Sequence, residues 1–119
     1  MNVVVIGASN KPNRYSYKVL KKLLENGHTV FPIHPRLEEI EGLKVFHSLK
    51  EISEKIDTIT LYVASDRSTM MQDDIFSISP RRIIFNPGAE NTILFKNAQE
   101  KGITAMNACT LVMLSTQQF

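Results

Sequence analysis

The hydrophobic positions of the chain fall into short continuous runs that alternate with longer stretches of helical spacing. The first run, Val3 to Ile6, consists of β-branched residues, which is typical of a strand buried on both faces. In the stretch from Arg14 to Asn26 the leucines and Val19 recur on one side of a helix, and the lysines point elsewhere. Gly27 follows at the position of a left-handed cap. This segment therefore predicts a strand, a tight turn and an amphipathic helix.

The rest of the chain repeats the same alternation. Further strands are expected over 28–33, 57–63, 81–86 and 103–108. Helices are expected over 64–78, which begins with Ser65 and Asp66, and over 90–102, whereas 36–56 reads as a crossover with short helical pieces. Within 64–78 the buried stripe is expected to consist of Met70, Met71, Ile75 and Phe76. The alternation predicts an α/β fold, a five-stranded parallel sheet with helices on both faces, formed by residues 1–119 as one domain.

Composition and charge narrow the class of protein. A chain of 119 residues with 43% hydrophobic and 22% charged residues is of the size and composition of one globular domain. A net charge of +2 is too small to indicate a nucleic-acid surface, although it would not repel an anionic ligand. The single cysteine cannot form an internal disulfide, no apolar run is long enough to span a membrane, and "MNVVVIGASN" does not resemble a signal peptide. We therefore expect a cytoplasmic protein.

Small, proline and polar residues follow each expected strand. The carboxyl ends of parallel strands meet at one edge of a sheet, and ligands bind there near the point where the strand order reverses. The segments brought to this edge are 7–10, 34–36, 64–66, 86–88 and 107–109. The sequence thus locates a candidate site without naming its ligand.

The loop after the first strand reads "GASNKP". A dinucleotide fingerprint needs G-x-G-x-x-G, whose second glycine lets the backbone approach a pyrophosphate, and this loop has only Gly7. Gly7 still permits a tight turn, and the amides of Ala8, Ser9 and Asn10 are expected to be available to phosphate oxygens. The alternative is a strand-to-helix turn that binds nothing.

The second expected strand ends in "PIHPR". A nicotinamide site usually places Asp or Glu there for the ribose hydroxyls, whereas the nearest charge here is Arg36. A cation at this place suits a ligand with an extra ribose phosphate, such as coenzyme A or NADP. A solvated surface arginine is the alternative.

The stretch "VVVIGASNKPNRYSYKVLKKLLENGHTVFPIHPR", followed by "GLKVFHSL" and "DTITLYV", resembles the small stand-alone CoA-binding domain family. That family is similar to the N-terminal CoA-binding domain of succinyl-CoA synthetase alpha subunits. The resemblance extends from Met1 to about Cys109, and its most specific parts are the "GASNKP" loop and the "PIHPR" turn. It implies a Rossmann-like sheet with coenzyme A bound at the strand ends.

The resemblance also assigns residues to parts of the ligand. It implies that the diphosphate is lined by Gly7, Ala8, Ser9, Arg14 and Tyr15, beside the loop residue Asn10. It places the adenosine and its 3′-phosphate beside Ile33, His34, Pro35 and Arg36, with Ala64, Pro87 and Gly88 further along. Two features depart from the family: His34 stands where asparagine is usual, and the C-terminus "ACTLVMLSTQQF" lacks the usual Cys-Pro-Lys-type ending.

Other reactive side chains give weaker signals. Cys109 follows the last expected strand, near the proposed thiol end of coenzyme A, but a reactive thiol needs a neighbouring base or cation, and the sequence names none. The spacings of His28, His34 and His47 match no metal-ligand pattern. The apolar tail, "LVMLSTQQF", is expected either to pack on the sheet as a last helix or to cover a subunit contact in a possible homodimer.

We therefore interpret the sequence as a binding module for coenzyme A or an acyl-CoA, without catalytic residues of its own. One alternative is an NADP-dependent reductase-like protein with Arg36 on the 2′-phosphate. Another is an interaction protein whose nucleotide site is vestigial and whose apolar tail is the contact surface.

Overall fold

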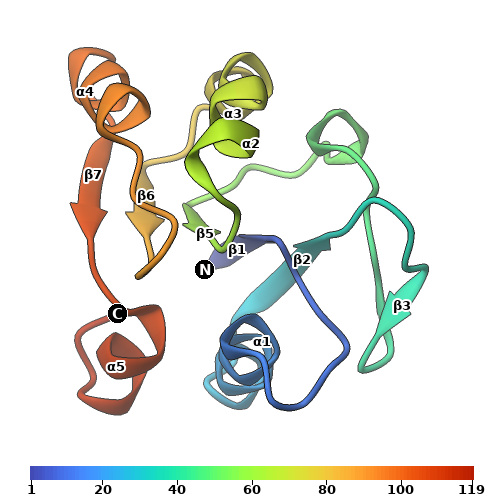
Figure 1. Cartoon of the computed structure of the whole chain (residues 1–119). Helices are drawn as coiled ribbons and strands as arrows, with labels where there is room; N and C mark the ends of the chain where they lie inside the picture. Colours follow the sequence, from blue (N-terminus) through green and yellow to red (C-terminus); the bar gives the residue numbers. More distant parts are fainter.

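A five-stranded parallel sheet lies at the centre of the computed structural model, which describes all 119 residues (Figure 1). The strands occur in the order β2-β1-β5-β6-β7, and every neighbouring pair is parallel. Their bounds are β1 Asn2–Ile6, β2 Thr29–Ile33, β5 Thr58–Leu61, β6 Arg82–Phe85 and β7 Thr104–Asn107. The predicted five-stranded, Rossmann-like α/β fold is confirmed.

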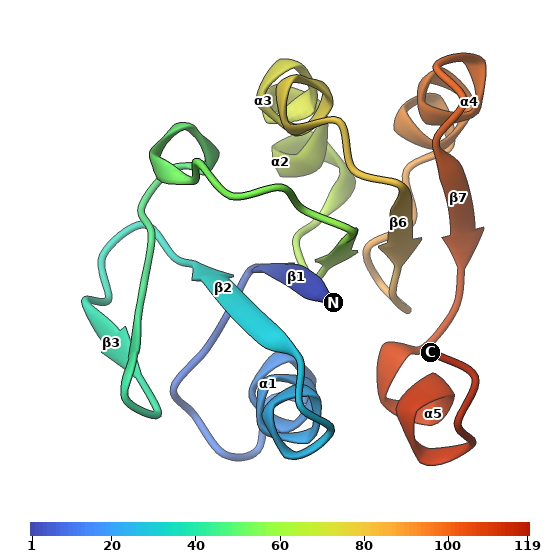
Figure 2. The ribbon, with the colours of Figure 1, turned by 180° about the vertical axis from the view of Figure 1, so that it is seen from behind.

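Helices cover both faces of this sheet (Figures 1 and 2). One face carries α1 (Tyr15–Glu25) and α5 (Thr110–Ser115), and the other carries α2 (Ser65–Met70), α3 (Gln72–Ile78) and α4 (Thr92–Glu100). Of the two alternatives for the C-terminal tail, the structure shows the helix, since Leu114 of α5 packs into the same core cluster as Leu20 and Leu23 of α1.

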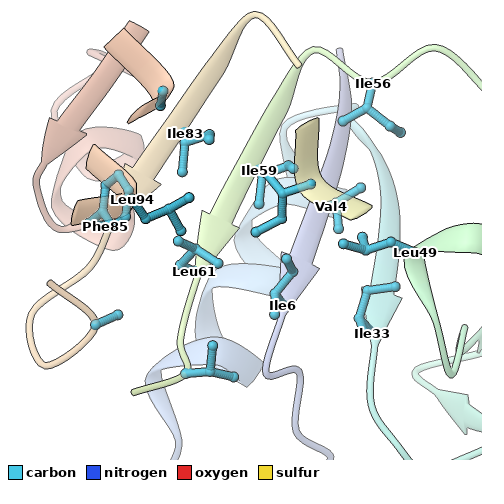
Figure 3. Packing of buried hydrophobic residues seen from close by; sticks show 14 of the residues in the cluster. Val4, Ile6, Ile33, Leu49, Ile56, Ile59, Leu61, Ile83, Phe85 and Leu94 are labelled. Atoms are coloured by element: carbon cyan, nitrogen blue, oxygen red, sulfur yellow. The ribbon is translucent and has the colours of Figure 1, made fainter. Parts of the chain in front are cut away.

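Side chains of β1 divide the core into two layers. Val3 and Val5 pack toward α1 and α5, whereas Val4 and Ile6 pack toward α3 and α4. Figure 3 shows the second layer, in which alternate residues of β1, β5 and β6 lie on the same side of the sheet. Because both faces are covered, the four successive residues Val3 to Ile6 of β1 are buried, which explains the continuous apolar run in the sequence.

The crossover between β2 and β5 differs from the prediction. Its first half is a small antiparallel hairpin, β3 (Glu39–Ile40) and β4 (Leu43–Lys44), and its helical part is one 3₁₀ turn, η1 (Leu49–Glu51). The hairpin turns through Glu41 and Gly42, whose φ angles of 52° and 77° are both left-handed. A two-residue turn of this kind matches the twist of a hairpin.

The predicted helix over 64–78 is interrupted at Met71, which separates α2 from α3. Ile75 is buried as expected and Met71 and Phe76 are half-buried, but Met70 is 86% exposed, so its place in the buried stripe was wrong. The reason is polar docking: the side chain of Asn91 donates to the Ser68 hydroxyl of α2 at 2.8 Å, so a serine faces α4.

The two outer strands have different surroundings. Phe46 closes the free side of β2, donating to the Pro32 carbonyl at 2.9 Å and accepting from the His34 amide at 3.1 Å. Strand β7 borders the sheet at the other end and is only partly buried. None of the helices has the length and apolar character that a membrane span requires.

Candidate functional site

The strand order reverses at β1. The chain passes from β1 to β2 on one side and then crosses to β5 on the other. Ile33, Ile6 and Leu61 are in register across these three strands, so the strands end level with one another. The loop after β1 therefore lies at the switch point, where open α/β sheets bind their ligands.

Gly7 begins this loop in a conformation that requires glycine. Its φ is +86°, and a Cβ there would lie 2.9 Å from the Tyr62 carbonyl oxygen and 3.0 Å from Cγ1 of Val63. The contact with backbone cannot be relieved by a side-chain rotation. The loops after β1 and β5 thus pack directly on one another at Gly7.

The sequence predicts that the amides of Ala8, Ser9 and Asn10 are all free, but in the structure one of the three is bonded within the protein. Ala8 is buried, and its amide donates to the Ile33 carbonyl at 3.1 Å, so the expectation that it would meet a phosphate was wrong. The Ser9 hydroxyl accepts from the Lys11 amide at 3.1 Å. The amides of Ser9 and Asn10 have no partner in the protein and remain available.

Helix α1 starts close behind with uncapped amides. Arg14 occupies the N-cap position without a side-chain cap, and the first intrahelical bond runs from the Lys18 amide to the Arg14 carbonyl at 3.1 Å. The first turn contains no acidic residue, and both Arg14 and Tyr15 are exposed. Three unpaired amides, the positive end of the helix dipole and Arg14 together favour an anion at this place.

His34 shapes the turn after β2. Its Nδ1 accepts from the amides of Arg36 and Leu37, both at 3.0 Å, so the proton of the neutral ring is on Nε2. Burial, followed by the positive charges of Arg36 and Arg67, lowers the pKa of His34. Pro35 and Arg36 are exposed. The Ile33 side chain lies in the core, so only the backbone of that residue could contact a ligand.

Arg67 is a charged residue of this region that the sequence analysis missed. It lies in α2, and its charge acts on His34, which follows a strand two places away in the sheet. The proximity of the two residues depends on the strand order, so no local pattern in the sequence marks Arg67.

Asn86 links the end of β6 to β5 and to the start of α5 through its side chain. Its amide nitrogen donates to the Thr60 hydroxyl at 2.7 Å and to the Leu61 carbonyl at 2.9 Å, while Oδ1 accepts from the Thr110 amide at 2.9 Å. Pro87 and Gly88 next to it are exposed, as is Ala64 after β5. The Gly88 amide donates to the Glu90 carboxylate at 2.9 Å, so it is not a free donor.

Tyr62 and Cys109 lie beside this network. Burial raises the pKa of the Tyr62 phenol, and the neighbouring hydroxyls of Thr60 and Thr110 oppose that shift. Cys109 is half-buried and occupies the N-cap position of α5 without a side-chain cap. The phenol is therefore held in its neutral form.

The three histidines do not gather into one group. His28 lies at the opposite edge of the sheet, with Nδ1 3.2 Å from the amino-terminal nitrogen and its ring 5.2 Å from that of Phe119. His47 contacts the Glu38 carboxylate at 3.3 Å. No three His, Cys, Asp or Glu side chains are arranged to hold a metal ion.

Two hollows in the surface also lie away from the carboxyl edge. One of about 460 Å³ lies between the end of α1 and the C-terminal tail and is lined by Lys22, Asn26, His28, Leu114, Ser115, Gln117 and Phe119. The other, about 520 Å³, lies between α3 and α4. The geometry that favours an anion is thus on the open carboxyl edge and not in either hollow.

The chain is similar to known proteins over most of its length. A family model described as "CoA binding domain" matches residues 1–115. Uncharacterized protein YneT of Bacillus subtilis (strain 168) is 28% identical over 111 residues, which is 92% of this chain and 82% of that protein. Acetate–CoA ligase (ADP-forming) II subunit alpha of Pyrococcus furiosus is 42% identical over 62 residues, which is 51% of this chain and 14% of the ligase subunit.

Solved structures share the fold over nearly the whole chain. The crystal structure of an uncharacterized protein superposes with a TM-score of 0.88 at 34% identity, covering 99% of this chain and 97% of the other. The sheet and its helices are therefore found as a unit of similar length in another protein.

Proposed function

The chain belongs to the CoA-binding domain family, and from this premise we propose that it binds coenzyme A or an acyl-CoA across the carboxyl edge of the sheet as a single unit of residues 1–119. The diphosphate lies against the loop after β1 and the start of α1, beside Gly7, Ser9, Asn10, Arg14 and Tyr15. Ala8 lies in the same loop, but its amide is bonded to the Ile33 carbonyl and does not donate to the ligand.

One observation carries this proposal: unpaired backbone amides gather at the switch point. The amides of Ser9, Asn10 and the first turn of α1 lack protein partners, and no acidic residue in that turn opposes an anion. N–H groups at a helix start that have no protein partner can donate to an anion, and a phosphate offers the acceptors and the negative charge that the helix dipole favours.

The adenosine end lies at the turn after β2. His34 holds this turn through two backbone amides and presents Arg36 to solvent, where a guanidinium suits the ribose 3′-phosphate. The pantetheine arm extends in the other direction, past Ala64 toward Pro87 and Gly88. The exposed backbone of these residues gives it an unobstructed surface.

We propose further that the chain binds this molecule without transforming it. The Nδ1 atom of His34 is occupied by two amides and is not free to accept a substrate proton. Burial raises the pKa of Tyr62, so its phenol stays protonated at neutral pH. Both groups thus support the fold and the ligand instead of serving as a general base.

A thermal-shift panel of coenzyme A, acetyl-CoA, NAD and NADPH tests the proposal. Ligand at about a hundred times its dissociation constant adds roughly 2.7 kcal/mol to the free energy of unfolding, which raises the Tm by on the order of ten degrees. We expect this shift with the two CoA compounds. A shift with NADPH and none with coenzyme A favours the reductase-like alternative, and no shift with any nucleotide favours a vestigial site.

A further inference from the structure

We propose that Arg67 is a specificity-determining residue for the ribose phosphate of the ligand, acting from the α2 side while Arg36 acts from the β2 side. This inference rests on the proposed function, since it assigns a second cation to the adenosine end of the same site. Arg67 lies six positions beyond the end of β5, just outside the segment 64–66 that the sequence predicts at the carboxyl edge.

The sheet places Arg67 opposite the His34 turn. Ile33 and Leu61 are level with each other on the two sides of β1, so the turn after β2 and the segment leading into α2 leave the sheet at the same height. Neighbouring strands are about 4.8 Å apart, so these two exits are separated by roughly 10 Å. Two arginine side chains reach across such a gap to a single phosphate between them.

A buried side chain holds α2 in place. The Asn91 amide nitrogen donates to the Ser65 carbonyl at 3.1 Å, the Ser68 hydroxyl at 2.8 Å and the Thr69 hydroxyl at 2.9 Å. Asn91 itself is 6% exposed and caps α4 by accepting from the Leu94 amide at 3.0 Å. Arg67 thus stands on a short helix that is anchored on both sides of it, which limits how far its Cα can move.

The charges around this place are not balanced by the protein. The ion pairs of the chain join His47 to Glu38 and Arg81 to Asp57, and neither involves Arg36 or Arg67. Burial first, and then the positive charges of Arg36 and Arg67, lower the pKa of His34, so both charges act at this turn. Repulsion between like charges in one region is relieved by a bound anion, and a phosphate dianion can accept from two guanidinium groups.

His34 adds a third donor. Because its Nδ1 is taken by the two turn amides, its Nε2–H is the remaining polar group of the ring. The imidazole is half-buried, and the bonds from the turn amides to Nδ1 fix the direction in which Nε2–H points. Two guanidinium groups and one ring N–H form a cradle that recognises a phosphate on the ribose and has no role for a bare hydroxyl.

Isothermal titration calorimetry of coenzyme A and 3′-dephospho-CoA against the wild-type chain and Arg67→Gln tests the assignment. Glutamine keeps a long helix-compatible side chain and removes the charge. We expect Arg67→Gln to weaken coenzyme A about tenfold and dephospho-CoA less than about twofold, since a charge-assisted hydrogen bond at an exposed site is near the lower end of its usual range. Lys21→Gln, which removes a charge from the outer face of α1, is the matched control and should change neither affinity.

The double variant Arg36→Gln/Arg67→Gln gives a second readout. If both arginines bind one phosphate, their effects on coenzyme A are coupled and do not add, whereas separate sites give additive losses. Equal weakening of the two ligands by Arg67→Gln, or no weakening of either, overturns the inference while leaving the proposed function intact. A wild-type chain that binds neither ligand overturns both.

Discussion

The Thr110 amide donates to the Asn86 side-chain oxygen at 2.9 Å, and this bond joins the end of β6 to the start of α5. The same side chain donates to the Thr60 hydroxyl and to the Leu61 carbonyl, both on β5. Asn86 is 1% exposed, so water cannot replace it as a partner. One amide therefore holds three segments together beneath the carboxyl edge.

Replacing Asn86 by alanine should lower the free energy of unfolding by about 3–5 kcal/mol, because it leaves a buried N–H and a buried carbonyl without partners. Urea unfolding measures the loss. Asn107→Ala, at the exposed end of the neighbouring strand β7, is the control and should change stability by no more than about 0.5 kcal/mol. Equal, small effects of the two variants would show that the network contributes little.

Gly7→Ala should destabilise the chain through both its backbone conformation and its contact with Tyr62. A left-handed alanine costs about 1–2 kcal/mol, and the overlap with a carbonyl adds about 1–3 kcal/mol more. Gly102→Ala separates the two terms, because Gly102 has a similar φ of +79° with nothing within 4 Å of its Cβ position. If both variants lose the same stability in urea unfolding, the approach to Tyr62 does not matter.

Cys109→Ser should stabilise the chain. Cys109 has the extended backbone of an N-cap residue, and the amides of Leu111 and Val112 have no acceptor. A serine hydroxyl at this position accepts from one of them, which contributes about 0.5–1 kcal/mol. Thermal unfolding checks the sign, and calorimetry with coenzyme A should show unchanged affinity. A large loss of affinity would instead assign the thiol a role in binding.

His34 should make the chain less stable in mild acid. Its pKa is lowered in the folded state, chiefly by burial, so below about pH 6.5 the unfolded chain takes up a proton before the folded one does. The stabilising contribution is complete above that pH and is lost as the pH falls toward the folded pKa. The pKa of His28 is also lowered, again chiefly by burial, and gives the same sign.

The variant His34→Asn isolates this effect, because an asparagine oxygen can accept from the amides of Arg36 and Leu37 but does not titrate. The drop in Tm between about pH 7.5 and about pH 5 should be smaller for His34→Asn than for the wild type, with His28 common to both. An identical drop in the two proteins would contradict the assignment.

The sheet was predictable because each strand is short, apolar and separated from the next by a helix. Buried strands leave a continuous hydrophobic run, and the crossovers leave helical spacing, so β1, β2, β5, β6 and β7 were all anticipated within a few residues. The carboxyl edge followed from the same alternation, since parallel strands end together.

The hairpin β3–β4 was missed because its turn carries an unusual residue. A left-handed first position normally contains Asn, Asp or Gly, whereas here it is Glu41. The Glu41 carboxylate accepts a hydrogen bond from the Tyr17 phenol of α1, which holds the residue in that conformation. A contact between residues so far apart in the chain leaves no local pattern.

The state of the site amides was equally hidden. Whether the Ala8 amide is free depends on where the Ile33 carbonyl lies in three dimensions, and no property of "GASNKP" records that. The sequence therefore overcounted the free amides of this loop. Arg67 was overlooked for a similar reason, because its place opposite His34 depends on the strand order.

The position of β1 also determines when during folding the site can form. Val3 pairs with Val30 of β2 on one side and with Thr58 of β5 on the other. The hydrogen bonding of β1, the first strand, is therefore complete only when β5 has been added. The backbone that packs against Gly7 is the Tyr62 carbonyl, which directly follows β5. Pairings this distant in sequence are slow because a long loop must close before they form. The loop after β1, although it is synthesised early, therefore takes its final shape only after β5 joins the sheet.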